Sequence, residues 1–359
     1  MVLACLAGPA HAVSNTSAAP DWRLTPGQAF NGVEGALDSA VRLWVDNAAG
    51  QASVCSGTLL AGGRHVLTAA HCAADFTSLR VDFGLVDGVA SESRGVAVGG
   101  VWLHSGWDGT LSSGADIAVL TLDAPVTGIR GATLSNGNDL GRDFLFAGYG
   151  STTTGDNRHG GAWTDPGFAH WGMNSFDVTS QVFKDATRGG GDNRFGETWL
   201  FDFDAQGVDR SWRHNTLQLM ANMHGKGWSS SAGLGDFEAF LAPGDSGAGA
   251  FVWDGSQWLL SGVMSWTMQY CQNTRVACDY STANASSFGD IAGATAVFSH
   301  TEWILGIIDA GQADETRGVQ VAMMAVTAVP EPGSYALFGA GLLVLGWASR
   351  RRRITSPLR

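Results

Sequence analysis

Residues 56–70 read Ser-Gly-Thr-Leu-Leu-Ala-Gly-Gly-Arg-His-Val-Leu-Thr-Ala-Ala, and this stretch decides the fold class. It holds two short apolar runs, Ser56–Leu60 and His65–Ala70, separated by a glycine pair. Runs of this length between turn-forming residues are typical of β-strands. The stretch therefore predicts a β-rich protein.

The same pattern recurs outward from this stretch, beginning at Phe30. Further strand-length runs are Ala40–Val45, Ile117–Leu122, Phe144–Ala147 and Leu259–Trp266. The chain of 359 residues has 50 glycines and 45% hydrophobic residues, enough for many turns and a sizeable core. No helical period appears before the C-terminal part, so the sequence predicts an all-β sandwich or pair of barrels.

Two regions depart from this strand pattern. Residues 150–236 contain several loop-like segments and are expected to be an insertion-rich part of a second β unit. Ser299 and Glu302 are spaced as a capping box, and an apolar helical face follows, which predicts a helix over residues 299–310.

Charge and cysteine content narrow the function classes. The formal charge is −12, and four of the cations stand together at Arg350–Arg353. A nucleic-acid partner is excluded, because phosphate binding needs clustered Lys and Arg on the body of the protein. Apart from Cys5, the cysteines are even in number and are expected to form disulfides in an oxidising compartment; they are Cys55, Cys72, Cys271 and Cys278.

The N-terminal residues resemble the end of an export signal. A short apolar run precedes Ala10-His-Ala12, an A-x-A cleavage pattern, which predicts a signal-peptide remnant over residues 1–12. Residues 13–29 are polar and rich in Pro and Ala, as in a leader or propeptide. The alternatives are an ordinary buried segment and a lipoprotein acylated at Cys5.

The C-terminal residues combine three features. Val329-Pro-Glu-Pro332 precedes an apolar run over Tyr335–Ala348, and Arg350–Arg353 follow. This arrangement resembles the PEP-CTERM sorting signal of Gram-negative bacteria, expected here over residues 329–353 after a linker at 311–328. The resemblance implies transient inner-membrane association through residues 335–348, processing by an exosortase-type enzyme, and secretion or display at the cell surface or in the extracellular matrix. A permanent tail anchor is the alternative, although the run is short for a membrane span.

The strongest chemical motif is Ala242-Pro-Gly-Asp-Ser-Gly-Ala248. A Ser between glycines suits a tight turn in which the N–H groups of Gly244 and Ser246 converge as an oxyanion hole. The hydroxyl of Ser246 needs a base that accepts its proton, and that base needs an orienting carboxylate.

The base and carboxylate candidates lie earlier in the chain. His71 follows an apolar run in Thr68-Ala-Ala-His-Cys72, where a Cys55–Cys72 disulfide can hold it in place. Asp116 heads the apolar strand Asp116–Leu120, so that it can be buried beside His71.

These three motifs, in the order His, Asp, Ser, resemble the trypsin/chymotrypsin family of serine proteases. The resemblance covers about residues 30–310 and implies two packed antiparallel six-stranded β-barrels, at about 30–140 and 141–298, with the C-terminal helix after them. It implies a serine endopeptidase acting on polypeptides through an acyl-enzyme on Ser246, with His71 as general base and Asp116 as the orienting group.

The resemblance also assigns substrate-binding positions. Ser265 and Trp266 match a strand that pairs with the substrate backbone, and Ser265 is expected to hydrogen-bond Asp116. Phe240 falls at the base of the primary specificity pocket, where trypsin has an Asp, so cleavage after Lys or Arg is not expected. Thr267 replaces a Gly of the pocket wall and should narrow the pocket.

Some features depart from the family. Gly247-Ala-Gly249 replaces the usual Gly-Gly-Pro after the nucleophile. The family's N-terminal amine pairs with the Asp before the nucleophile, here Asp245. Phe30–Val33 is the expected matching segment, yet no clear basic activation site precedes it. Cys271 and Cys278 match no usual pair and are expected to close a local loop.

Other interpretations remain at this stage. A protease-like scaffold without activity could serve as an adhesin or matrix-binding protein. An esterase of the Gly-Asp-Ser type would need a base after Ser246, and only His300 follows it. Asp202–Gly207 is spaced like the start of a calcium loop but lacks the closing Glu, so an acidic turn is expected, with no cofactor and no metal.

Overall fold

We describe the fold from a computed structural model of the whole chain. The structure describes residues 14–17, 22–156, 165, 167–187, 194–205, 215–225, 227–269 and 285–312. The predictions for residues 1–12, for Cys271 and Cys278, and for the tail at 329–353 fall outside these ranges.

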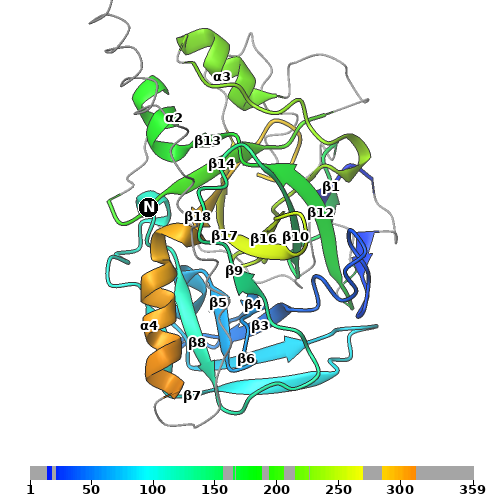
Figure 1. The fold of residues 1–359 in the computed structure, drawn as a ribbon, viewed down its shortest axis with the longest axis vertical. Helices are drawn as coiled ribbons and strands as arrows, with labels where there is room; N and C mark the ends of the chain where they lie inside the picture. Colours follow the sequence, from blue (N-terminus) through cyan, green and yellow to red (C-terminus); the bar gives the residue numbers. More distant parts are fainter. Residues whose placement is uncertain are drawn as a thin grey trace, which may run out of the picture. The chain divides into compact units, whose positions relative to one another are not determined.

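Six strands of the first half close into an antiparallel barrel (Figure 1). Its order around the wall is β3-β4-β5-β8-β7-β6. The strands are β3 (Ala40–Asp46), β4 (Ala52–Leu59), β5 (His65–Thr68), β6 (Ser78–Phe83), β7 (Glu92–Leu103) and β8 (Ala118–Leu122).

The barrel interior follows the alternation in the sequence. In β3, Val41, Leu43 and Val45 are buried, while Arg42 and Trp44 between them are partly exposed. Successive side chains of a strand point to opposite faces, so the alternating residues form one wall of the core. The predicted run at Ala40–Val45 is thus the inner face of a barrel strand.

The second half forms a nine-stranded sheet beside the barrel. Its order is β13-β14-β18-β17-β16-β10-β12-β2, with β9 paired to β17. The strands are β2 (Arg23–Leu24), β9 (Thr133–Leu134), β10 (Asp143–Gly148), β12 (Ala169–Ser175), β13 (Val178–Thr179), β14 (Thr198–Asp202), β16 (Gly249–Trp253), β17 (Trp258–Met268) and β18 (Ile291–Ala296).

The longer strands of this sheet form the counterpart of the first barrel. They run β14-β18-β17-β16-β10-β12, so β14 and β12 face each other across the open side. There the buried amide of Asn174, in β12, donates to the carbonyl oxygens of Asp202 at 2.9 Å and of Ala239 at 3.0 Å. At this point a side-chain hydrogen bond stands in place of the backbone pairing that would close a six-stranded barrel.

The N-terminal segment differs from the prediction of a leader at 13–29. Strand β1 (Ser14–Asn15) lies between β11 (Thr153–Thr154) and β15 (Ala239–Phe240), and β2 pairs with β12. Ser14 and Asn15 have no exposed surface. The described parts of this segment are therefore built into the fold.

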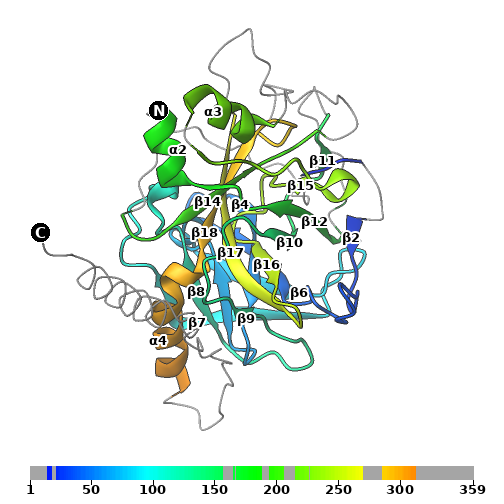
Figure 2. The ribbon, with the colours of Figure 1, turned by 45° about the horizontal axis from the view of Figure 1, so that its top comes forward.

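Helices are few and short within the described residues. They are α1 (Ala70–Ala73), α2 (Ser180–Thr187), α3 (Thr216–His224) and α4 (Thr301–Gln312), with 3-10 turns η2 (Leu111–Ser113), η4 (Gly235–Phe237) and η5 (Val297–His300). Figure 2 shows α2 and α3 near the second-half sheet and α4 near the barrel strands β7 and β8.

The C-terminal helix is confirmed, but its predicted start is wrong. Ser299 lies inside the turn η5, and α4 begins at Thr301. The Ser299 hydroxyl accepts the N–H of Glu197 at 3.2 Å instead of capping the helix. A tertiary partner thus takes the side chain that local sequence assigned to a cap.

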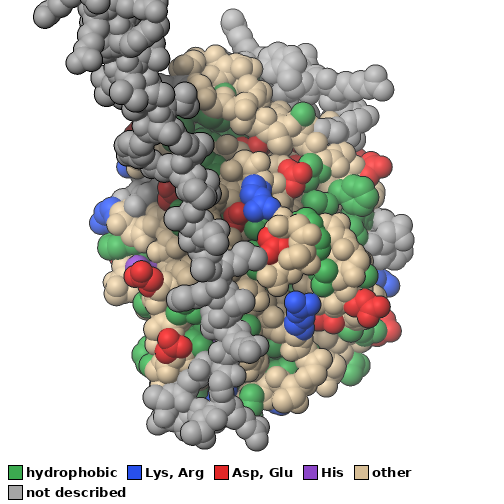
Figure 3. All heavy atoms as spheres, in the orientation of Figure 1, with side chains coloured by type: hydrophobic (Ala, Val, Ile, Leu, Met, Phe, Trp, Pro, Cys, Tyr) green, Lys and Arg blue, Asp and Glu red, His purple; other side chains and the backbone are tan. Residues whose placement is uncertain are grey.

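The all-β class is confirmed, with one closed barrel and few helices. On the face drawn in Figure 3, Lys and Arg side chains stand apart rather than in a continuous basic patch. None of the helices in the described ranges has the length and apolar character needed to cross a bilayer.

Candidate active site

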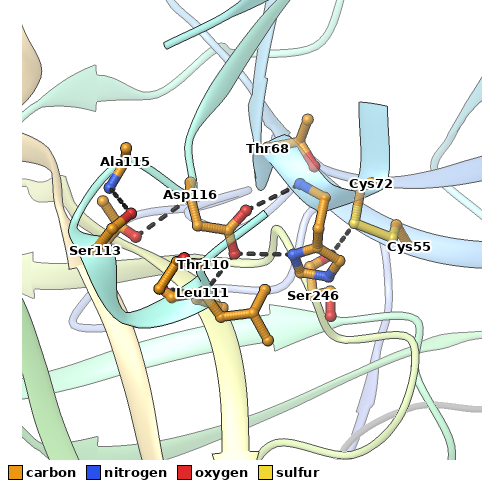
Figure 4. Close-up of polar contacts among 12 residues, drawn as sticks. Cys55, Thr68, Cys72, Thr110, Leu111, Ser113, Ala115, Asp116 and Ser246 are labelled. Atoms are coloured by element: carbon orange, nitrogen blue, oxygen red, sulfur yellow. Dashed lines mark hydrogen bonds and ion pairs between the residues drawn. A yellow bond between two sulfur atoms is a disulfide. The ribbon is translucent and has the colours of Figure 1, made fainter. Parts of the chain in front are cut away.

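The centre of the site is a hydrogen-bonded pair formed by Asp116 and His71 (Figure 4). The Oδ2 atom of Asp116 lies 2.8 Å from Nδ1 of His71, and its Oδ1 atom accepts the backbone N–H of His71 at 2.9 Å. Two contacts fix both the ring and its backbone relative to the carboxylate. With Nδ1 engaged, Nε2 is the nitrogen left to accept a proton.

The surroundings of Asp116 hold its carboxylate in place. Asp116 has no exposed surface, and Ser265, from β17, donates its hydroxyl to Oδ2. Thr295, from β18, donates to the carbonyl oxygen of Asp116 at 3.2 Å. The acid from the first barrel is therefore held by two strands of the second half.

Local structure explains why His71 sits at this place. Strand β5 ends at Thr68, and the single turn α1 (Ala70–Ala73) carries His71 on its exposed side, with Ala70, Cys72 and Ala73 buried. The predicted Cys55–Cys72 disulfide is present, with 6.1 Å between the Cα atoms. The His71 side chain keeps 27% of its surface exposed, so a substrate can reach it.

Ser246 lies on a tight turn anchored at both ends. The Asp245 N–H donates to the carbonyl of Ala242 at 3.0 Å, and the Gly247 N–H donates to the carbonyl of Met264 at 2.7 Å. Gly247 has φ +86°, and a Cβ there would lie 2.1 Å from Oγ1 of Thr68. Only glycine fits this position, since any side chain would collide with the first barrel.

The turn brings Ser246 close to the imidazole. The carbonyl of Ser246 accepts the N–H of Ser56 at 2.8 Å and lies 3.6 Å from Sγ of Cys72. That sulfur is within 4.8 Å of a ring nitrogen of His71. Figure 4 draws the partly exposed Ser246 side chain beside the ring that Asp116 contacts.

The expected oxyanion hole lies on the same turn. In the described part of the chain, the N–H groups of Gly244 and Ser246 donate to no protein acceptor. Gly244 adopts φ +103°, a conformation that favours glycine. Two free backbone donors, two residues apart in the sequence, are suited to bind a negatively charged oxygen.

The predicted pocket residues lie in different surroundings. Phe240 is fully buried in the core, with its ring 5.5 Å from that of Phe203 and 5.8 Å from that of Phe201. Trp266 and Thr267 are partly exposed on β17, directly after Ser265. The strand expected to bind substrate thus reaches the surface beside the site, whereas Phe240 packs inward.

Asp245 and its expected partner segment do not meet in a described contact. The buried carboxylate of Asp245 accepts the N–H of Gly150 at 2.8 Å and that of Ala242 at 2.9 Å. Phe30 and Val33 exchange backbone hydrogen bonds in a local turn, and the Phe30 ring packs on Trp171. The strand that borders the Asp245 region is β1, which pairs with β15 five residues before Asp245.

Sequence reasoning missed several residues that support the site. Besides Thr295, Ser56 donates its hydroxyl to the carbonyl of Gly244 at 3.0 Å and accepts the N–H of Tyr149 at 2.9 Å. Ser56 lies beside Cys55, but nothing in the local pattern marks its hydroxyl. Such contacts follow from the meeting of two distant segments and leave no periodic signal.

Neither the alternative base nor a metal site is supported by the described contacts. His300 places Nε2 2.7 Å from the carbonyl of Gly114 and its ring 4.7 Å from that of His104, and no described contact joins it to Ser246. Cys55, His71 and Cys72 form the one close group of possible metal ligands in the described ranges, but both sulfurs are in the disulfide.

Comparison with known proteins agrees with this architecture. The Trypsin family model matches residues 31–161, which include His71 and Asp116, and the PEP-CTERM protein-sorting motif matches residues 328–353. A solved structure described as HL collagenase is similar over 81% of this chain and 97% of its own, with a TM-score of 0.52 and 16% identity. No curated protein sequence matches the chain.

The Trypsin match ends at residue 161, inside the insertion-rich region and before Ser246. The sorting motif indicates export to the cell surface or extracellular space of a Gram-negative bacterium, with processing by an exosortase. Residues 31–161 therefore match the Trypsin family model, the described fold is similar to that of the collagenase structure, and residues 328–353 match the PEP-CTERM sorting motif.

Proposed function

We propose that this protein is an exported serine endopeptidase that uses Ser246, His71 and Asp116 as its catalytic triad. The observation that carries the proposal is the buried Asp116 paired with His71 at 2.8 Å, beside the turn of Ser246. A buried carboxylate that orients an accessible imidazole beside an exposed hydroxyl is the arrangement that nucleophilic acyl transfer requires.

The chemistry follows from these positions. Nε2 of His71 accepts the Ser246 proton as Oγ attacks the carbonyl carbon of the peptide, and His71 then passes the proton to the leaving amine as the C–N bond breaks. Water next gives a proton to His71 and attacks the acyl-enzyme, and the serine leaves with that proton. Asp116 stabilises the imidazolium during both the acylation and the deacylation step.

The free N–H groups of Gly244 and Ser246 support the stabilisation of the developing oxyanion. Each such donor contributes about 3–4 kcal/mol to the transition state in comparable sites. The turn is fixed by backbone contacts to the first barrel, such as the Ser56 N–H to the Ser246 carbonyl. Little reorganisation is then needed when charge develops.

The proposal also includes a preference for the side chain at the cleavage site of the substrate. The partly exposed Trp266 and Thr267 continue from Ser265 and are positioned to contact a peptide beside the catalytic groups. The family resemblance assigns the charge-pairing position to residue 240, which is a fully buried Phe, so cleavage after Lys or Arg is not expected. A small or medium apolar residue at the cleavage site is the preference we propose.

Activation by an N-terminal amine at Asp245 also belongs to the proposal. The segment best placed to deliver it is β1 rather than Phe30–Val33, because β1 pairs with β15 close to Asp245 and borders β11 on its other side. The A-x-A pattern ends at Ala12, two residues before β1. Removal of the export leader there would leave a new amine beside this strand.

A fluorophosphonate probe tests the nucleophile directly. The processed wild-type protein should be labelled at Ser246, and Ser246→Ala should lose both the label and casein hydrolysis. Ser256→Ala, at an exposed turn, is the matched control and should keep both. A folded wild-type protein that neither takes the label nor cleaves casein would instead favour the silent adhesin or matrix-binding alternative.

A further inference from the structure

A second polar centre, apart from the triad, lies in the insertion-rich region. It consists of Asp177, Asp202, Asp204 and Glu238, which we call the acidic cluster. Asp202 and Glu238 have no exposed surface, and Asp204 has 3%. Isolated carboxylates are seldom buried so fully, because the loss of hydration is costly unless a partner compensates it.

Each acid accepts hydrogen bonds from helix α3 or from nearby loops. Asp202 accepts the N–H of Leu217 at 2.8 Å and the hydroxyl of Ser230 at 3.2 Å. The remaining bonds are Asp177 Oδ1 with the Ser231 N–H at 2.5 Å, Asp204 Oδ2 with the Asn215 amide at 3.2 Å, and Glu238 Oε2 with the Leu234 N–H at 2.6 Å.

The second oxygen of three of these acids has no hydrogen-bond partner. These buried atoms are Oδ2 of Asp177, Oδ1 of Asp204 and Oε1 of Glu238. Within the described ranges, no Lys, Arg or His forms an ion pair with any member of the acidic cluster. Burial, together with the charges of the neighbouring acids, holds the pKa of Asp204 well above its usual range.

We propose that the acidic cluster binds a calcium ion through the free oxygens of Asp177, Asp204 and Glu238. Calcium is a hard cation that takes several carboxylate and carbonyl oxygens in flexible geometry, and these acids offer oxygens only. Magnesium demands a tighter octahedral shell and keeps much of its water, so it fits a buried, protein-lined site less well.

Side-chain rotation must accompany binding. In the described ranges, no three oxygens of these acids lie within 4.8 Å of one another. The ion would draw the free oxygens together while the opposite oxygens keep their present donors.

The position of the site gives it a role in stability. The three proposed ligands come from separate segments of the second half. Asp177 directly precedes β13, Asp204 follows the end of β14, and Glu238 directly precedes β15. Strand β15 leads within a few residues to the turn of Ser246. Calcium should therefore stabilise the region that supports the nucleophile.

The test uses the full chain after treatment with EDTA and removal of the chelator. Addition of CaCl2 should raise the Tm of the wild type in a saturable way, and calorimetry should give one site. Asp204→Asn and Glu238→Gln should each bind calcium at least about tenfold more weakly, because each loses a ligand. Asp236→Asn, at an exposed acid two residues from Glu238, should behave as the wild type.

A wild-type Tm that does not respond to CaCl2, with no heat of binding, overturns the proposal. The same holds if Asp236→Asn weakens binding as much as Glu238→Gln does. Because the wild-type titration needs no variant, a variant that fails to fold does not decide the outcome. Neither readout uses catalysis, so this result and that of the fluorophosphonate test are independent.

Discussion

At the residue scale, Asp116 shows how one buried charge can organise a site. Its two oxygens accept from His71 twice and from Ser265, and its own backbone carbonyl accepts from Thr295. Four groups from both halves of the molecule thus converge on one residue. Its substitution should disturb chemistry more than folding, provided that the replacement keeps the shape.

Asp116→Asn is the variant that keeps the shape. The amide should favour the wrong tautomer of His71, so that Nε2 no longer accepts the Ser246 proton, and kcat should fall about 10⁴-fold with little change in KM. Steady-state kinetics on a peptide substrate, with circular dichroism for the fold, measures this. Wild-type kcat in the folded variant would remove Asp116 from the triad.

His65 allows a second prediction at this scale, about pH. Burial, and secondly the charge of Arg64, lower the pKa of His65 from 6.5 to about 4. The neutral ring is favoured in the folded state, so its stabilising contribution is complete above pH 6.5 and is lost as the pH falls toward 4. The loss amounts to up to about 3 kcal/mol for such a shift.

His65→Leu should remove this pH dependence, because leucine has a similar volume and does not titrate. Urea unfolding between pH 7 and pH 4 should therefore show the variant gaining stability relative to the wild type as the pH falls. If the two stability curves run parallel over this range, the buried imidazole does not control acid stability.

The proposed catalytic residues could be selected from the sequence because each stands in a short, distinctive motif. Ser265 was expected beside Asp116 from the family resemblance, and the structure places it there. Thr295 and Ser56 could not be found in this way, because a hydroxyl in an ordinary strand carries no mark of its distant partner. The same holds for Glu238, whose acidic neighbours come from other segments.

At the scale of elements, β1 differs most from the sequence-based prediction. A short polar segment before a strand-rich domain resembles a leader, yet Ser14 and Asn15 are fully buried between β11 and β15. Ser14 also donates its hydroxyl to the carbonyl of Ser286 at 2.8 Å. Two residues are too few to show an alternating pattern, so only tertiary pairing identifies them as a strand.

This placement predicts the mature N-terminus. If the leader is cut after Ala12, mass spectrometry of the exported protein should find Val13 as its first residue. A free α-amine has a pKa of about 8, so an amine paired with Asp245 should keep its charge to somewhat higher pH and activity should fall above that point. Asp245→Asn should lower kcat at every pH.

Cleavage nearer to Phe30 would contradict this prediction, because it would remove β1. The N-terminally acetylated protein offers a control, since it keeps β1 but carries no amine charge. It should be folded and poorly active. Full activity after acetylation would show that Asp245 needs no amine partner.

At the scale of the whole molecule, the chain crosses from the second half back to the first. The first barrel supplies His71 and Asp116, the second half supplies Ser246 and Ser265, and α4 then packs on the first barrel. Sequence predicted the two halves and the final helix. It could not predict that Asn174 bridges β12 and β14, because that contact depends on how the insertions between them fold.

The packing of α4 on the first barrel predicts where the chain can be shortened. Ile304, Ile307 and Ile308 bury their side chains in the same core as β3, β5 and β8, with 0%, 8% and 2% exposure. A chain that ends at Gln312 retains them and every proposed catalytic group. It should hydrolyse peptides with the kcat/KM of the full protein while losing surface sorting, because the motif at 328–353 is gone.

A chain that ends at His300 provides the matched comparison, because it also lacks the sorting motif but loses α4. Each buried isoleucine contributes about 2–5 kcal/mol, and a whole domain is stable by only about 5–15 kcal/mol, so this shorter chain should not fold. Circular dichroism and peptide hydrolysis on both chains measure the difference. Equal activity of the two would mean that α4 does not complete the first barrel, whereas inactivity of both would mean that the tail takes part in folding.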